Sequence, residues 1–127
     1  MTDMIRYPYS GTVIEGFHNG RKFGFPTLNI ALDPGITFTE TGVFAVSVII
    51  GECCYYGMLY VGNRPTLSMK ELSIEIHVFD FSSEIYGCRV QFSVRKKIRG
   101  DIKFDSVEQL ISQIKKDQDE IRGFFGC

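Results

Sequence analysis

Residues 42–50 read Gly-Val-Phe-Ala-Val-Ser-Val-Ile-Ile, and the dipeptide Gly51-Glu52 follows them. This stretch is rich in β-branched and aromatic residues, which favour extended backbone, and the dipeptide indicates a turn. Tyr55–Val61 has the same character and is suited to be the returning strand. The two segments therefore predict a pair of antiparallel strands.

Later segments show the alternation of strands that bury one face. In Leu72–Phe81, polar Ser73, Glu75 and His77 alternate with an apolar set, which is Leu72, Ile74, Ile76 and Val78. Residues 89–95 alternate in the same way around Val90, Phe92 and Val94. Short strands without helices between them imply an antiparallel sheet over about residues 9–98. With about six strands in one domain, closure into a barrel would best protect the sheet edges.

One helix is predicted near the end of the chain, starting at Asp105 or Ser106. Both residues have a Glu or Gln three positions later, which is the spacing of a capping box. Apolar residues then recur at helical spacing, at Val107, Leu110, Ile111, Ile114 and Ile121. We expect this stripe to pack on the barrel, and the alternative is a face for a partner protein.

Composition limits the classes of function. The chain has 127 residues and a net charge of −1, so we expect one domain and no overall attraction to nucleic acid. No apolar run approaches the roughly 18 residues of a membrane span, and the N-terminus lacks the order of a signal peptide. Cysteines 53, 54, 88 and 127 form no C-x-x-C pair, so we expect no zinc site but free, buried thiols in a reducing cytoplasm.

A glycine-rich stretch carries the clearest sign of chemistry. Residues 16–30 read Gly-Phe-His-Asn-Gly-Arg-Lys-Phe-Gly-Phe-Pro-Thr-Leu-Asn-Ile. Glycines allow the backbone to approach a ligand closely, Arg21 and Lys22 add positive charge, and Thr27 and Asn29 offer oxygens that Mg²⁺ accepts. The spacing fits neither the P-loop nor the dinucleotide fingerprint. Taken alone, the stretch could be a phosphate and Mg²⁺ site or a turn with nothing bound.

The ordered set of motifs resembles the riboflavin kinase (flavokinase) family, which also forms the C-terminal part of bifunctional bacterial FAD synthetases. Residues 11–29 resemble its G-x-V-x-x-G-x-x-x-G-R-x-x-G-F-P-T-x-N pattern, and residues 42–45 its G-V-Y-A strand. Residues 62–66 resemble its G-x-R-P-T turn, and residues 74–81 resemble its V-E-x-H-x-x-D-F strand. The family pattern is also matched at Tyr86-Gly87, Ile98-Arg99 and residues 104–106. The resemblance covers about residues 9–120. It implies a six-stranded antiparallel Greek-key β-barrel with a C-terminal α-helix packed on it.

The resemblance also implies an activity and a set of site residues. The activity is transfer of the ATP γ-phosphate to the 5′-hydroxyl of riboflavin, which gives FMN and ADP. The family pattern assigns the catalytic base to Glu75 and the Mg²⁺ and phosphate contacts to Thr27 and Asn29. It further implies a phosphate-covering flap that includes Gly16, Gly20 and Arg21, an adenine pocket that includes Tyr86, and flavin contacts from Arg99 and Phe104.

Several alternatives stay open at this stage. The chain could be a stand-alone kinase or one domain of a bifunctional enzyme, and it could be a non-catalytic flavin-binding module. Leu28 stands where the family usually has Ala, so its side chain could enter the core or alter the site. The basic residues in 95–99 give weak support to a single-stranded nucleic-acid binder. Against that alternative, we expect a monomer that binds riboflavin, FMN, ATP and ADP, with no nucleic acid and no membrane.

Overall fold

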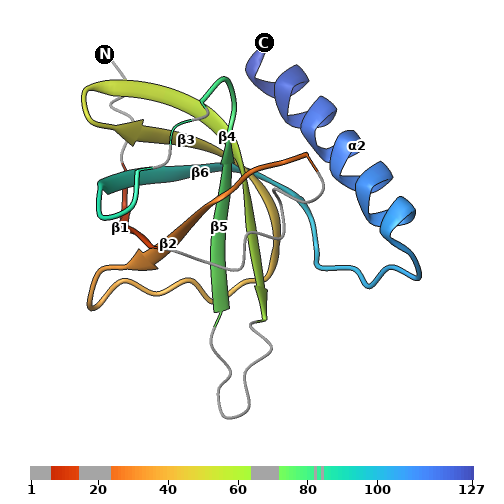
Figure 1. Ribbon diagram of the computed structural model, residues 1–127, viewed down its shortest axis with the longest axis horizontal. Coiled ribbons are helices and arrows are strands. Elements are labelled where there is room, and N and C mark those ends of the chain that lie inside the picture. The colour runs from red at the N-terminus through yellow and green to blue at the C-terminus, as the bar shows by residue number, and fades with distance from the viewer. Residues whose placement is uncertain (1–6, 15–23, 64–71, 82, 84) are drawn as a thin grey trace.

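The computed structural model describes residues 7–14, 24–63, 72–81, 83 and 85–127. Its elements are β1 (Tyr9–Ile14), β2 (Leu28–Leu32), β3 (Gly42–Ile50), β4 (Cys53–Asn63), β5 (Leu72–Val78), β6 (Arg89–Arg99) and α2 (Val107–Phe125). Figure 1 shows the strands wrapped around one another, with α2 lying along the outside. Among the described residues, no helix has both the length and the apolar character needed to cross a membrane.

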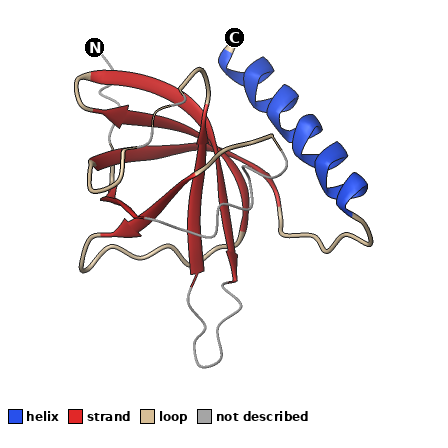
Figure 2. Ribbon diagram, in the orientation of Figure 1, coloured by secondary structure: helices blue, strands red, loops and turns tan. Residues whose placement is uncertain are grey.

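The strands form a closed antiparallel barrel in the order β1-β2-β5-β4-β3-β6. Strands β3, β4 and β5 follow one another as neighbours, and β2 lies beside β5, which is a Greek-key order. The predicted six-stranded Greek-key barrel with one C-terminal helix is therefore confirmed. Figure 2 shows the strands of the described residues in the barrel and the helix alongside them.

The predicted turn between β3 and β4 is confirmed at Gly51-Glu52, since Ile50 and Cys53 are paired on either side of it. Gly51 has a φ of 63°, a backbone conformation that glycine adopts without strain. This tight connection fixes the register of β3 against β4, which pairs Ala45 with Met58.

The hydrophobic core has two parts. The barrel interior is filled by alternate side chains of all six strands, including Phe44 and Val46 of β3, Ile76 of β5 and Phe92 of β6. The opposite face of β3 contributes Val43 and Ala45 to a second cluster with Met58 and Phe79, and α2 adds Ile121 to it. Because β3 is covered on both faces, it reads as a continuous apolar run rather than an alternating one.

Helix α2 begins as its sequence indicates. Ser106 is the N-cap, and its hydroxyl accepts a 3.2 Å hydrogen bond from the backbone N–H of Gln109. Ile121 is fully buried and Ile114 packs on the second cluster, so the stripe packs on the barrel as expected. Val107 is an exception, because it is half exposed at the first turn, before the helix reaches the barrel.

The prediction of buried cysteines is wrong. Cys53, Cys54, Cys88 and Cys127 are all free thiols, but all four are exposed. Cys53 and Cys54 open β4 at the turn end of the hairpin and Cys127 is the last residue, and at such ends little chain is available to cover a side chain.

Candidate active site

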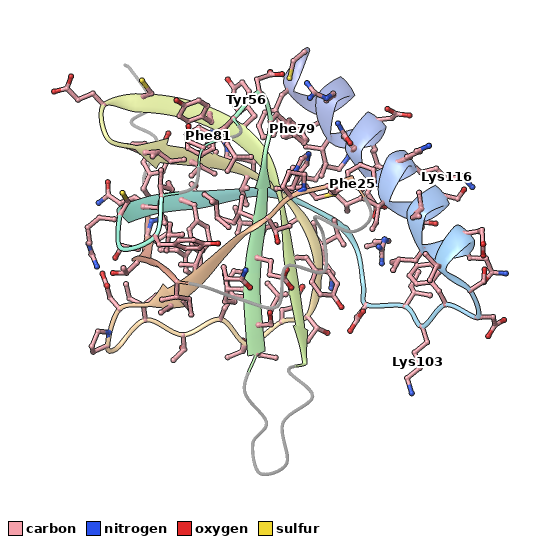
Figure 3. All side chains as sticks on the ribbon, in the orientation of Figure 1. Phe25, Tyr56, Phe79, Phe81, Lys103 and Lys116 are labelled. Carbon is pink, nitrogen blue, oxygen red and sulfur yellow. The ribbon has the colours of Figure 1, made fainter. Side chains whose placement is uncertain are left out.

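A cavity of about 520 Å³ lies between the outer wall of the barrel, α2 and the loop that joins β6 to α2. Much of its lining is apolar and includes Val43, Met58, Phe104 and Leu110. Phe25 also lines it, and Figure 3 shows this residue between the barrel and the helix. Half of the lining residues are polar or charged, including Thr27, Glu75 and Arg99, but most of the exposed lining surface is apolar. A mainly apolar cleft with a few convergent polar groups is typical of a site for a small molecule.

Glu75 projects from the middle of β5 into this cavity. Its neighbours Ile74 and Ile76 point into the barrel interior, so the alternation predicted from the sequence is confirmed. The Thr27 hydroxyl donates a 2.9 Å hydrogen bond to Oε1 of Glu75, and the Ser73 hydroxyl donates one of 3.2 Å to Oε2. Both carboxylate oxygens are thus held, which fixes the side chain on a rigid strand.

The pairing of β2 with β5 brings the Pro-Thr-Leu-Asn segment to Glu75. Asn29 is directly opposite Glu75 in the register, and Leu28 is opposite Ile76. Leu28 packs against the barrel core, so it lies on the other side of the strand from Thr27 and Asn29. The bulk that distinguishes Leu28 from Ala therefore enters the core and not the cavity.

His77 is a second polar residue of β5 that lines the cavity. Its Nδ1 lies 2.8 Å from the carbonyl oxygen of Pro26, and since a carbonyl can only accept, Nδ1 carries the hydrogen. The ring centres of Phe25 and Phe79 each lie 5.7 Å from the centre of its ring. Burial lowers the pKa of His77 below its usual 6.5, and the Arg122 cation adds to this effect. A neutral His77 thus ties the backbone just before Thr27 to β5.

Arg99, at the end of β6, forms a largely buried ion pair with Asp117 of α2. Its Nε lies 3.0 and 2.9 Å from the two carboxylate oxygens, and its Nη2 lies 2.9 Å from Oδ2. Asp117 is 2% exposed and also accepts a 2.9 Å hydrogen bond from Gln113. Gly42 allows β6 to approach this closely, because a Cβ there would lie 2.4 Å from the Arg99 carbonyl oxygen. The pair joins the barrel to the helix at the cavity wall.

Phe104 lies beside Arg99, whose guanidinium carbon is 5.7 Å from the centre of the Phe104 ring. Both residues line the cavity, so the structure brings together these two predicted flavin contacts. Tyr60 lines the cavity as well, on β4 opposite Glu75 in the register. Its hydroxyl donates a 3.1 Å hydrogen bond to Asp101. Burial and the Asp101 carboxylate raise the pKa of Tyr60 to about 12.

Among the described residues, the predicted adenine contact Tyr86 and the predicted metal ligand Asn29 are absent from the lining of this cavity. Tyr86 is half exposed in the turn before β6 and is absent from the lining, although the next residue, Gly87, donates a 2.7 Å backbone bond to Val13 of β1. Gly16, Gly20 and Arg21 lie outside the described residues. Their predicted contacts with phosphate therefore stay predictions.

The donors near Glu75 suit a magnesium ion better than a softer metal. The Thr27 hydroxyl gives its hydrogen to Glu75, so its oxygen lone pairs remain for a cation, and the buried Asn29, opposite Glu75 in the register, carries a side-chain carbonyl oxygen. Mg²⁺ takes oxygen ligands and keeps several waters, so two neutral oxygens and nucleotide phosphates can hold it. Within the described ranges, no group of three His, Cys, Asp or Glu side chains could hold a metal ion.

Sequence reasoning assigned no role to four residues that line the site: Tyr60, His77, Asp101 and Asp117. His77 shares the polar face of β5 with Glu75, so the alternation placed it correctly but gave it no role. Asp117 is an acidic residue on the barrel side of α2, four residues before the fully buried Ile121, and this was a usable signal of a buried ion pair.

Comparisons with known proteins identify the family of the chain. The family model described as "Flavokinase: Riboflavin kinase" matches residues 4–125. A bifunctional riboflavin kinase/FMN adenylyltransferase of Bacillus subtilis is 36% identical over 127 residues, which cover 96% of this chain and 40% of that protein. An RNA-binding riboflavin kinase of the same organism is 41% identical over 109 residues, which cover 85% of this chain and 46% of that protein.

Among solved structures, a protein of Streptococcus pneumoniae described as a macrolide-efflux protein has a TM-score of 0.83 and 37% identity. The match covers 90% of this chain and 38% of that one. The chain thus spans about 40% of the length of the first curated relatives it matches. Because the family model covers nearly all of its residues, the chain belongs to the riboflavin kinase family.

Proposed function

We propose that this chain phosphorylates riboflavin with ATP and so forms FMN and ADP. Membership of the riboflavin kinase family supports this activity. The observation that carries the proposal is the position of Glu75, a carboxylate held by two hydroxyl groups at the wall of an apolar cavity.

Glu75 acts as the general base in this reaction. Its carboxylate accepts the proton of the riboflavin 5′-hydroxyl as that oxygen bonds to the γ-phosphorus of ATP. The bond from this phosphorus to the β–γ bridging oxygen breaks, and ADP leaves. A positioned base of this kind contributes about 10²–10⁴-fold to the rate. Phosphoryl transfer depends mainly on positioning and charge, and the hydrogen bonds from Thr27 and Ser73 supply the positioning of Glu75.

Thr27 and Asn29 would hold Mg²⁺ beside the base. The bound ion would offset the charge on the phosphate oxygens. On the protein side, His77 fixes the carbonyl of Pro26 and therefore the backbone that presents Thr27. The apolar lining of the cavity would accept a flat, aromatic flavin ring, with Phe104 and Arg99 among its contacts. ATP would lie toward the glycine-rich stretch, where Gly16, Gly20 and Arg21 are the proposed phosphate contacts and Tyr86 an adenine contact.

Incubation of the chain with riboflavin, ATP and Mg²⁺, followed by chromatography for FMN, tests the activity. Formation of FMN that disappears in Glu75→Gln would support it. A chain that binds riboflavin tightly but forms no FMN would instead be a non-catalytic flavin-binding module of the same fold. The presence of Glu75, Thr27 and Asn29 in one place favours the kinase.

The basic segment 95–99 gives little support to nucleic-acid binding, although one relative is described as RNA-binding. Lys96 and Lys97 pair with Glu120 and Glu40, Arg95 bonds to Ser47, and Arg99 is neutralised by Asp117. The absence of nucleic-acid binding, a monomeric state and a cytoplasmic location stay predictions from the sequence.

A further inference from the structure

The loop of residues 100–106, between β6 and α2, forms one wall of the cavity. Asp101, Ile102 and Phe104 line the cavity from this loop. Its two ends are anchored, at Arg99 by Asp117 and at Ser106 by the N-cap bond to Gln109. The residues between these anchors are largely exposed, and Ile102 is 49% exposed although it is apolar. A flat apolar substrate in the cavity would cover such a side chain.

A side chain of the barrel contacts the middle of this loop. The Tyr60 hydroxyl on β4 donates a 3.1 Å hydrogen bond to Oδ1 of Asp101. The Tyr60 ring lies over Gly62, where a Cβ would be 2.6 Å from both the hydroxyl oxygen and a ring carbon. Gly62 therefore leaves the space that this orientation of Tyr60 requires. This hydrogen bond joins β4, which pairs with β5 at Glu75, to the loop that forms the facing wall of the cavity.

We propose that Tyr60 and Asp101 form a clasp that holds the 100–106 loop against the barrel and thereby sets the affinity for the flavin substrate. Tyr60 is then a positioning residue, and its effect reaches the substrate through Ile102 and Phe104. This part of the inference rests on the proposed function. Because the pKa of Tyr60 is raised to about 12, the phenol remains a hydrogen-bond donor at every pH at which the protein would be assayed.

Tyr60→Phe removes the hydroxyl and keeps the ring. We expect the Kd and KM for riboflavin to rise about three- to tenfold, which is the size of one net hydrogen bond, while kcat changes by less than about twofold. Flavin fluorescence on binding gives the Kd, and FMN chromatography gives the kinetic constants. Tyr56→Phe is the matched control, because Tyr56 is on the same strand but stacks on Phe125 away from the cavity.

A second measurement reports on the loop without any ligand. Lys103 is exposed in this loop, and Figure 3 shows its side chain pointing away from both barrel and helix, so trypsin can reach it. Cleavage after Lys103, followed by mass spectrometry, should be about three- to tenfold faster in Tyr60→Phe and Asp101→Ala than in the wild type. The double variant should be no faster than either single variant. Gly62→Ala, which displaces the Tyr60 ring, should show the same effect.

The outcomes separate this inference from the proposed function. Tyr60→Phe with unchanged riboflavin affinity and unchanged cleavage after Lys103 would overturn the clasp, as would additive effects in the double variant. A wild-type chain that forms no FMN would contradict the proposed activity, and the cleavage rates would still decide whether the clasp holds the loop. If Tyr60→Phe does not fold, Asp101→Ala and Asp101→Asn decide the matter, because Asn keeps an acceptor and should have the smaller effect.

Discussion

The Thr27 hydroxyl donates a 2.9 Å hydrogen bond to Oε1 of Glu75, although 48 positions separate the two residues in the sequence. The pairing of β2 with β5 makes this contact possible, since Asn29 lies opposite Glu75. One hydroxyl thus positions the proposed base and leaves its lone pairs for the proposed metal ion. Variants of Glu75 test the base alone, whereas variants of Thr27 change both roles of its hydroxyl together.

Replacing Glu75 by Gln should reduce FMN formation by about 10²–10⁴-fold, because the amide cannot accept the proton of the 5′-hydroxyl. Riboflavin affinity and thermal stability should change little, since Gln keeps the shape of the side chain. Glu120→Gln is the control, as Glu120 is exposed on α2 and pairs with Lys96 outside the cavity. Near wild-type turnover by Glu75→Gln would rule out Glu75 as the base.

Thr27→Val keeps the shape of the side chain but removes its oxygen, and Thr27→Ser keeps the oxygen. We expect kcat/KM for Mg·ATP to fall about tenfold or more in Thr27→Val, because both the hydrogen bond to Glu75 and a metal ligand are lost. Thr27→Ser should retain most of the activity. Steady-state kinetics with varied Mg·ATP measures the effect, and equal values for the two variants would contradict the assignment.

Asp117→Ala should destabilise the fold by about 3 kcal/mol, because the largely buried Arg99 guanidinium would be left without its partner. Glu120→Ala breaks an exposed pair of 3.9 Å on the same helix and should cost less than about 1 kcal/mol. Urea unfolding of both variants gives the comparison. Similar losses of stability in the two variants would contradict the ion pair between Arg99 and Asp117 that the structure shows.

His77 should make the protein less stable at acidic pH. Its folded-state pKa lies below the unfolded value near 6.5, so the folded state binds fewer protons than the unfolded state in this range. The stabilisation is complete above pH 6.5 and is lost as the pH falls through the folded-state pKa. Urea midpoints between pH 5 and 8 should therefore fall more steeply in the wild type than in His77→Gln.

Nuclear magnetic resonance provides an independent check of His77. Its ring signals should titrate below pH 6.5, because desolvation and the Arg122 cation both disfavour the charged form. A titration at or above 6.5 would contradict the neutral ring that donates to Pro26.

Local patterns predicted much of the fold correctly. Alternation placed Ile74 and Ile76 inside the barrel and Glu75 outside it, and the capping-box spacing indicated a helix start at Asp105 or Ser106, of which Ser106 is the N-cap. The same patterns failed for Val107 and for the four cysteines, which are exposed. An apolar residue type favours burial. Near the end of a helix or strand, however, other chain segments do not always lie close enough to cover the side chain.

The sequence by itself determined the strands, the helix and the family, because these depend on residue periodicity and on ordered motifs. It also pointed to Glu75, Thr27 and Asn29 through the resemblance. Only the tertiary structure decided that Arg99 is held by Asp117, that Tyr60 bonds to Asp101 and that Leu28 enters the core. Each of these contacts needs a particular strand order or helix position, and the periodicity of one segment carries no information about its neighbours in space.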